Sequence, residues 1–156
     1  MRRRPALPCL ALALLLPACS AYETPRFEVV GVRETDRTAE AAVLTFTLAA
    51  TNRNEVELPL RETTYTLTLD GTRVFEGERS AAATVRAFGT QAFTLPATVP
   101  ADRFDLTRLD EGGALPYRLE GVVSYQTPGE FAEVLFDAGV RRPKAPIVVR
   151  GIIDIE

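Results

Sequence analysis

Residues 44–51 read LTFTLAAT, and residues 61–71 read RETTYTLTLDG. In both stretches apolar side chains alternate with threonine or alanine, which is the two-residue period of a strand that buries one face. Threonine suits the other face because its branched side chain fits the pleat and its hydroxyl tolerates solvent. Asp70 and Gly71 then form a turn signal, since both central residues of a two-residue hairpin turn need a positive φ. The pattern therefore predicts a β-hairpin whose second strand covers 72–80.

The same alternation recurs along the rest of the chain. Further strands are expected at 27–32, 90–99, 115–125, 131–140 and 147–156. Pro96 lacks the N–H that a central strand needs, so its strand is expected at a sheet edge. Residues 126–130 contain Pro and Gly and are interpreted as a hairpin connection. A bridge of small residues at 81–89 and a linker at 141–146 separate the remaining strands.

One helix is expected, at 102–112. Asp102 can cap its start, Leu106 and Leu109 are three residues apart, and Gly112 can end it. Short strands separated by turn signals, with a single short helix among them, predict an all-β fold of two stacked antiparallel sheets.

The first twenty residues read as an export signal. Arginines at 2–4 precede an apolar run at 7–16, which is shorter than the ~20 apolar residues of a membrane span. The segment resembles the signal of bacterial lipoproteins, in which a Leu, two small residues and a Cys mark the cut and the Cys thiol receives lipid. Pro17 departs from the Ala, Ser or Thr that is usual at its place. The resemblance implies cleavage between Ala18 and Cys19 and lipidation of Cys19.

These features divide the chain into a lipoprotein signal peptide at 1–18, a lipidated tether at 19–25 and one β-sandwich domain at 26–156. Two or three acyl chains attach a protein to a membrane almost permanently. Ser20 after the modified Cys favours the outer membrane, with the domain facing the periplasm. The expected partners are the membrane, through the N-terminal lipid, and envelope proteins.

Residue types that the chain lacks exclude several chemistries. It contains no histidine and no tryptophan, and Cys9 leaves with the signal. Without histidine the Ser-His-Asp and Cys-His constellations cannot form, and zinc, copper or haem would find no nitrogen or free sulfur ligand. No cofactor and no metal is therefore expected. The 21 acidic residues exceed the 18 basic ones, so nucleic acid is not an expected partner either.

Neighbouring carboxylates are the remaining candidates for chemistry. They are Asp102, Asp105, Asp110 and Glu111. Their spacing does not match a calcium loop, and the favoured interpretation is that they are helix caps and surface charges. A pair such as Asp102 with Asp105 leaves glycoside hydrolysis as an enzymatic alternative. No catalytic residue is assigned.

Residues 27–140 resemble the late embryogenesis abundant type 2 family, also called the water stress and hypersensitive response (WHy) domain. That family shows an alternating strand running into Asn-Pro-Asn, a second strand, a glycine hairpin and later strands with Gly, Ser and Pro at set places. The matching residues here are Leu44–Thr51, Asn52, Asn54, Leu58, Leu60, Tyr65, Gly71, Gly77, Ser80, Gly89, Leu95, Pro96, Tyr117, Leu119, Gly121 and Phe136. Arg53 replaces the central Pro of the family motif.

The resemblance implies an immunoglobulin-like or fibronectin-III-like sandwich of seven strands with a short helix, and a non-catalytic role in desiccation or other stress. Asn52 and Asn54 form a candidate binding loop, although side-chain hydrogen bonds that close the loop are the favoured interpretation. We expect a non-enzymatic, lipid-anchored domain that protects or binds envelope proteins. The alternative is an adaptor that recruits a partner strand to the apolar stretch 147–155. For that stretch itself, the favoured interpretation is a strand that pairs inside its own sandwich.

Overall fold

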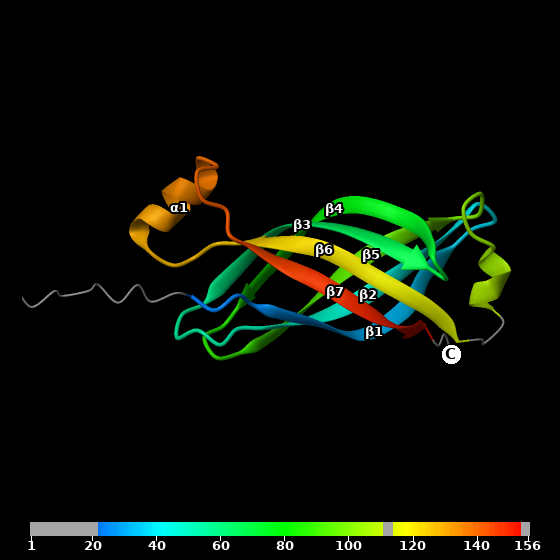
Figure 1. Cartoon of the computed structure of the whole chain (residues 1–156), viewed down its shortest axis with the longest axis horizontal. Coiled ribbons are helices and arrows are strands. Elements are labelled where there is room, and N and C mark those ends of the chain that lie inside the picture. Colours follow the sequence, from blue (N-terminus) through cyan, green and yellow to red (C-terminus); the bar gives the residue numbers. More distant parts are fainter. Residues whose placement is uncertain (1–21, 111–113, 154–156) are drawn as a thin grey trace, which may run out of the picture.

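Seven strands and two short helices make up the described part of the chain, residues 22–110 and 114–153, in the computed structural model (Figure 1). In chain order these elements are β1 (Arg26–Arg37), β2 (Ala41–Thr51), β3 (Leu58–Leu69), β4 (Thr72–Val85), β5 (Thr90–Pro100), η1 (Leu106–Leu109), β6 (Leu115–Tyr125), α1 (Glu130–Asp137) and β7 (Lys144–Ile153).

The strands form two antiparallel sheets, and this confirms the expected two-sheet sandwich. One sheet has the order β1-β2-β5, and the other has the order β4-β3-β6-β7. The sheets lie face to face along a common long direction (Figure 1). β5 pairs only with β2 and therefore lies at an edge, as the missing N–H of Pro96 predicts. β7 pairs with β6, so residues 147–153 of the C-terminal stretch belong to a strand of this sandwich, and residues 154–156 lie outside the described residues.

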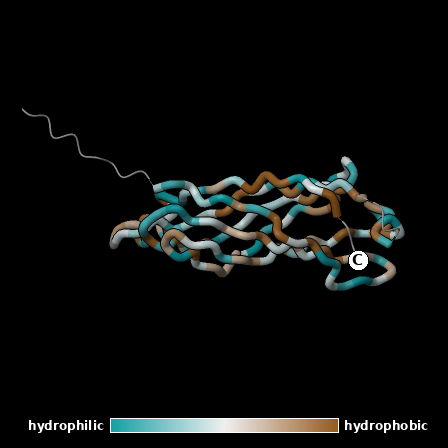
Figure 2. The backbone as a smooth tube through the Cα atoms, turned by 90° about the horizontal axis from the view of Figure 1, so that it is seen from below, coloured by the Kyte–Doolittle hydropathy of each residue, from teal (hydrophilic) through white to brown (hydrophobic). Residues whose placement is uncertain are grey.

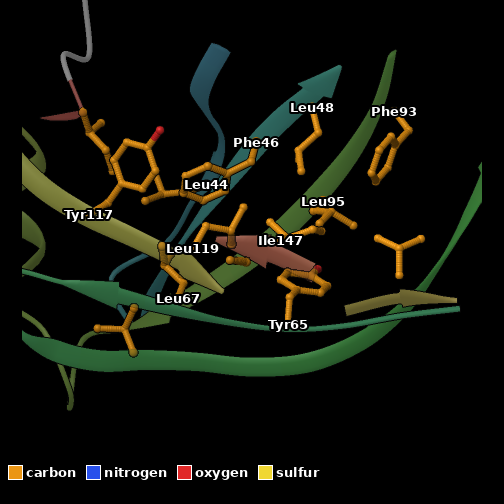
Figure 3. Close-up of a cluster of buried hydrophobic side chains, with 14 of the residues drawn as sticks. Leu44, Phe46, Leu48, Tyr65, Leu67, Phe93, Leu95, Tyr117, Leu119 and Ile147 are labelled. Atoms are coloured by element: carbon orange, nitrogen blue, oxygen red, sulfur yellow. The ribbon is translucent and has the colours of Figure 1, made fainter. Parts of the chain in front are cut away.

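The core is built from the alternate residues that the sequence pattern selects (Figure 3). Leu44, Phe46 and Leu48 of β2 are fully buried, and the facing sheet contributes Leu67 and Leu119, which are also fully buried. Hydrophilic and hydrophobic residues alternate along the strands (Figure 2). Burial of these apolar side chains is the main force that holds the two sheets together.

The predicted hairpin between β3 and β4 is present. Asp70 has φ 44° and Gly71 has φ 79°, so both residues adopt the positive φ that a type I′ turn requires. Leu69 lies opposite Thr72. The turn thereby sets the register of the two longest neighbouring strands.

The strand predicted at 131–140 is wrong, because these residues begin with α1 rather than with a strand. Ala132, Leu135 and Phe136 are spaced as one face of a helix, and Phe136 is buried. The connection 126–130 is consequently not a hairpin turn. β6 pairs with β7 instead, and Ser124 lies opposite Lys144.

Other boundaries also differ from the prediction, since β1 continues to Arg37 and β7 begins at Lys144, inside the predicted linker 141–146. Among the described residues, the helix expected at 102–112 is the four-residue 3-10 helix η1, and its predicted end, Gly112, lies outside them. The cap of η1 is Asp105, which accepts a hydrogen bond from the Thr107 backbone N–H at 3.0 Å. The predicted bridge 81–89 is half strand, because β4 continues to Val85. Ala81 and Ala83 pack against the core, so the small residues of this segment belong to β4 and not to a loop.

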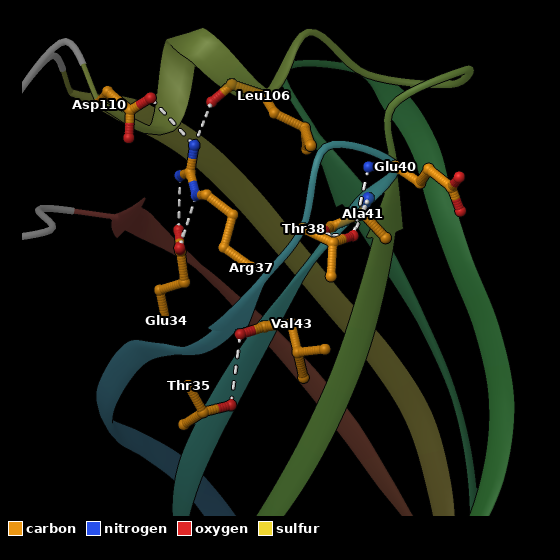
Figure 4. Close-up of polar contacts among 9 residues, drawn as sticks. All are labelled: Glu34, Thr35, Arg37, Thr38, Glu40, Ala41, Val43, Leu106 and Asp110. Carbon is orange, nitrogen blue, oxygen red and sulfur yellow. Dashed lines mark hydrogen bonds and ion pairs between the residues drawn. The ribbon is translucent and has the colours of Figure 1, made fainter.

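Arg37 ties η1 to the first sheet at the end of β1 (Figure 4). Its Nε and Nη2 each donate to the Glu34 carboxylate at 2.6 Å, and its Nη1 donates to Asp110 Oδ2 at 2.9 Å and to the Leu106 carbonyl at 3.3 Å. The hydrogen bond to Glu34 raises the pKa of Arg37 above its usual range. A bidentate pair of this kind holds the turn region in one geometry.

Candidate functional site

Asn52, one of the two candidate binding residues, is buried at the end of β2. Only 1% of its surface is exposed. Its Nδ2 donates to the carbonyls of Val56 at 2.7 Å, Arg86 at 3.1 Å and Val85 at 3.3 Å, and its Oδ1 accepts from the Asn54 N–H at 2.9 Å. Asn52 thus joins the loop 52–57 to the end of β4. Its side-chain amide is fully used within the protein.

Asn54 clasps the segment that precedes β1. Its Oδ1 accepts from the Glu23 N–H at 2.7 Å, and its Nδ2 donates to the Glu23 carbonyl at 2.9 Å. The Nδ2 group also donates to Asn52 Oδ1 at 2.8 Å. The same carboxamide therefore pairs with both backbone groups of Glu23 in the way a neighbouring strand would. Arg53, between the two asparagines, is exposed.

This pair explains why the loop closes without the family's proline. The side chains of Asn52 and Asn54 replace backbone hydrogen bonds that the turn cannot make for itself. The structure brings the two residues together and gives each a structural role. A binding role for the loop stays a prediction, and Ala18 and Cys19 lie outside the described residues.

The loop belongs to one end of the sandwich, which we call the tethered end: residues 22–25, the loops 52–57 and 86–89, and the segment 126–143 that contains α1. Arg26 lies opposite Thr51, and Thr51 lies opposite Thr90, so the first loops are adjacent. The Gln126 N–H donates to the Pro59 carbonyl at 2.9 Å. Segment 22–25 and α1 lie at the same end of the molecule (Figure 1).

The tethered end carries exposed apolar side chains that sequence reasoning missed. Phe131 is 79% exposed, Phe88 70% and Val140 73%. Val134 and Tyr22 are exposed as well. Helical spacing in 131–140 was the available signal, because Ala132, Leu135 and Phe136 supply one apolar face and leave Phe131 and Val134 on others.

Two of the predicted carboxylates have structural roles. Asp105 caps η1, and hydrogen bonds from Thr107 hold its pKa below the usual range. Asp110 pairs with Arg37 at 2.9 Å. A general acid for glycoside hydrolysis needs a raised pKa instead. Asp102 is exposed, and Glu111 lies outside the described residues.

A second group of carboxylates lies on the outer face of the β4-β3-β6-β7 sheet, where a shallow hollow is lined by Glu76, Glu78 and Glu120. A hydrogen bond with Glu62 raises the pKa of Glu78. Arg118 pairs with Glu120. These side chains are exposed or half-buried, and the arrangement is that of a solvated charged surface.

The part of the chain that the structure describes contains no group of three or more acidic, His or Cys residues that could hold a metal ion. In the same ranges no helix has the length and apolar character needed to cross a membrane.

Comparison with known proteins identifies the family. The family model described as late embryogenesis abundant protein (LEA_2) matches residues 47–138, which is more than half of the chain. The chain belongs to this LEA_2 family. The match runs from β2 to the end of α1, so it includes Asn52, Asn54 and the exposed residues of α1. No curated protein matches the chain.

Solved structures share the LEA_2 chain's fold. A solution structure of an Arabidopsis thaliana protein has 20% identity and a TM-score of 0.67, with 94% of this chain and 91% of that chain covered. A candidate late embryogenesis abundant protein has 18% identity and a TM-score of 0.57, covering 83% and 70%. An Archaeoglobus fulgidus protein has 11% identity and a TM-score of 0.52, covering 87% and 98%. At these identities the likeness shows the fold alone.

Proposed function

We propose that this LEA_2 protein is a non-enzymatic lipoprotein, held in the bacterial cell envelope by lipid on Cys19, that protects or binds envelope proteins under stress. Members of the family are generally not enzymes, and two of the predicted carboxylates have structural partners, Asp105 with Thr107 and Asp110 with Arg37. The proposed function then depends on contacts that the surface of the domain makes with other molecules.

The clasp between Asn54 and Glu23 is the observation that carries this proposal. Asn54 fixes the backbone of Glu23 at one end of the sandwich, only four residues after Cys19. A lipid on Cys19 would therefore attach the domain to the membrane by one fixed end of the sandwich.

The anchor is tested on the full chain expressed in a bacterium with an envelope of two membranes. Mass spectrometry of the N-terminal peptide should find a diacyl or triacyl group on Cys19, and Cys19→Ser should move the protein to the soluble fraction. Unmodified Cys19 in the wild type, or a Cys19→Ser variant that still sediments with membranes, contradicts the proposal.

The protective role is tested by drying and freezing a labile enzyme with the purified protein. We expect more enzyme activity to survive than with an equal mass of an inert protein. Arg53→Pro, which restores the Asn-Pro-Asn motif in the loop, is a matched variant that changes one exposed residue. Equal survival with the inert protein contradicts a protective role.

Strand augmentation is the second candidate, and it rests on the position of β7. β7 lies at the edge of its sheet, with Val148 and Ile152 62% and 63% exposed. An open edge with apolar side chains accepts a partner strand. Val148→Lys combined with Ile152→Lys should leave the fold intact and abolish capture of an envelope protein; unchanged capture contradicts this candidate.

A further inference from the structure

We propose that the tethered end is a membrane-contacting surface, in which Phe131 and Val134 of α1 and Phe88 of the loop 86–89 enter the interfacial layer of the bilayer. This inference rests on the lipid anchor proposed above. It adds a second, non-covalent contact that fixes how the domain stands on the membrane.

The distribution of exposed apolar residues is the first support. Eight large hydrophobic residues are exposed in the described ranges. Those outside the strands all lie at the tethered end: Tyr22, Phe88, Phe131, Val134 and Val140. At the opposite end the described turns expose Glu40, Asp70 and Arg103 and no large apolar residue, and the one exposed apolar side chain near that end is Ile152, on β7. Scattered apolar residues need no explanation, but their gathering at one end of the molecule marks an interaction surface.

The pattern of α1 is the second support. Ala132, Leu135 and Phe136 face the protein and are half-buried or buried, while Phe131 and Val134 point away from it and are 79% and 62% exposed. A surface helix of a globular protein normally has charged or polar residues on its outer side. The outer side of α1 therefore presents apolar area that a contact can bury.

The length of the chain before Glu23 identifies what covers the outer side. Four peptide units separate Cys19 from Glu23, and they span at most about 14 Å when fully extended. Lipid on Cys19 keeps that residue at the bilayer surface. The tethered end is therefore held against the headgroup layer, because Asn54 fixes Glu23 to it. In the anchored protein the lipid surface is therefore the nearest partner available to α1.

The charges near α1 are compatible with this contact. Arg141, Arg142 and Lys144 follow the helix, and the Arg142 guanidinium lies 5.4 Å from the centroid of the Phe136 ring. Long basic side chains can keep apolar stems in the interface and reach phosphates with their charged ends. Glu133 and Asp137 are also exposed on α1, so charges of both signs border the surface. Apolar burial is the main attraction, and salt should weaken the contact little.

The absence of tryptophan from the chain makes a direct test possible. Phe131→Trp places the only tryptophan of the protein on α1. Ile152→Trp is the matched control, since Ile152 is 63% exposed on β7 and lies near the opposite end, across from Pro116. Both full-length lipidated variants are reconstituted in vesicles of phosphatidylethanolamine and phosphatidylglycerol, with or without phospholipids whose acyl chains are brominated.

We expect brominated lipid to remove most of the emission of Phe131→Trp and to leave that of Ile152→Trp unchanged, at low and high salt alike. Interfacial helices bury their apolar side by roughly 5–10 Å, which brings the indole close to the bromines. Equal emission of the two variants overturns the proposal. So does a blue shift of Phe131→Trp that depends on protein concentration and not on bromine, because it shows that a second copy covers α1.

Mass spectrometry of the same samples separates this proposal from the anchor. Lipid on Cys19 without quenching of Phe131→Trp leaves the anchor standing and overturns the surface contact. An unmodified Cys19 overturns both. As a further check, Phe131→Ser combined with Val134→Ser should keep the protein on the vesicle through its lipid but raise hydrogen exchange of the α1 amides; unchanged exchange overturns the contact.

Discussion

Tyr65 of β3 donates a hydrogen bond from its hydroxyl to the backbone carbonyl of Pro96 in β5, across the space between the two sheets. Tyr65 is 3% exposed, and its ring packs against Phe75 with centroids 5.3 Å apart. Pro96 cannot donate to a sheet partner, and it lies in an edge strand whose outer side has no neighbour in its own sheet. The contact therefore links the edge of one sheet to the interior of the other.

Removing this hydroxyl should destabilise the sandwich. We expect Tyr65→Phe to lower the free energy of unfolding by about 1 kcal/mol, because one hydrogen bond is lost while the ring stays in place. Urea unfolding followed by far-UV circular dichroism measures the change. Tyr22→Phe is the control, since Tyr22 is 40% exposed and lies outside the strands. Equal stability of wild type and Tyr65→Phe contradicts a role for the bond.

The same tyrosine should make the protein sensitive to alkali. Burial raises the pKa of Tyr65 and the pKa of Tyr117 above the usual value of about 10. In the unfolded chain both ionise near that value, so the stability they contribute is complete below it and is lost as pH rises towards their folded pKa values. Urea midpoints across this range should fall with pH. The fall should be shallower in Tyr65→Phe, and an identical slope contradicts the prediction.

The two asparagines of the loop should differ in their effect on stability. Asn52→Ala removes bonds to three buried or partly buried carbonyls and should cost about 2–3 kcal/mol. Asn54→Ala frees Glu23 at an exposed site and should cost less than about 1 kcal/mol. Thermal unfolding measures both, and hydrogen exchange should show a faster Glu23 amide in Asn54→Ala. A larger loss for Asn54→Ala contradicts this ordering.

Gly121 should tolerate no side chain. A Cβ atom there would lie 2.3 Å from the Thr64 carbonyl oxygen and 2.8 Å from the Tyr65 Cβ. Because one of these atoms is backbone, Gly121→Ala must shift β3 or β6 and should cost about 3 kcal/mol or more. Gly31→Ala is the matched control, since the nearest atom to its Cβ is 4.0 Å away. Chemical unfolding measures the stability of the two variants. Similar stabilities would contradict the prediction, because they would show that the sheet adapts to the added Cβ atom.

A buried hydroxyl offers a stabilising substitution. Thr63 is fully buried, and its Oγ1 has no hydrogen-bond partner in the described part of the chain. Thr63→Val should raise the free energy of unfolding by about 1 kcal/mol, because an unsatisfied polar atom is replaced by a methyl group. Thr45→Val should act in the opposite direction, since Thr45 Oγ1 lies 2.9 Å from Thr35 Oγ1. Calorimetric midpoints that shift in the same direction contradict the argument.

The strands could be predicted because their signals are local. In β2, side chains two residues apart share a face, so the burial of Leu44 and Phe46 follows from spacing alone. Asp70 and Gly71 likewise need only their own φ preferences to set the hairpin. The edge position of β5 follows from the single missing N–H of Pro96.

The parts that could not be predicted depend on partners distant in sequence. The spacing of Ala132, Leu135 and Phe136 was a local helical signal, but the choice between helix and strand here depends on the pairing of β6 with β7, which leaves this stretch outside the sheet. Asn54 could be recognised as a turn residue, but its bonds to Glu23 join positions 31 residues apart. The gathering of Phe88 with Phe131 at one end results from topology and has no signal in either local sequence.

The bond from Asn54 to Glu23 also limits where an anchored form of this protein could work. With only four peptide units between Cys19 and Glu23, an anchored sandwich would stand with its long direction away from the membrane and would move only within a narrow layer above it. Strands of 11 residues at about 3.3 Å each reach roughly 35 Å outward. Molecules to be guarded would have to come to this layer, and the turns around Arg37 and Asp70 would be the first part of the protein that they meet.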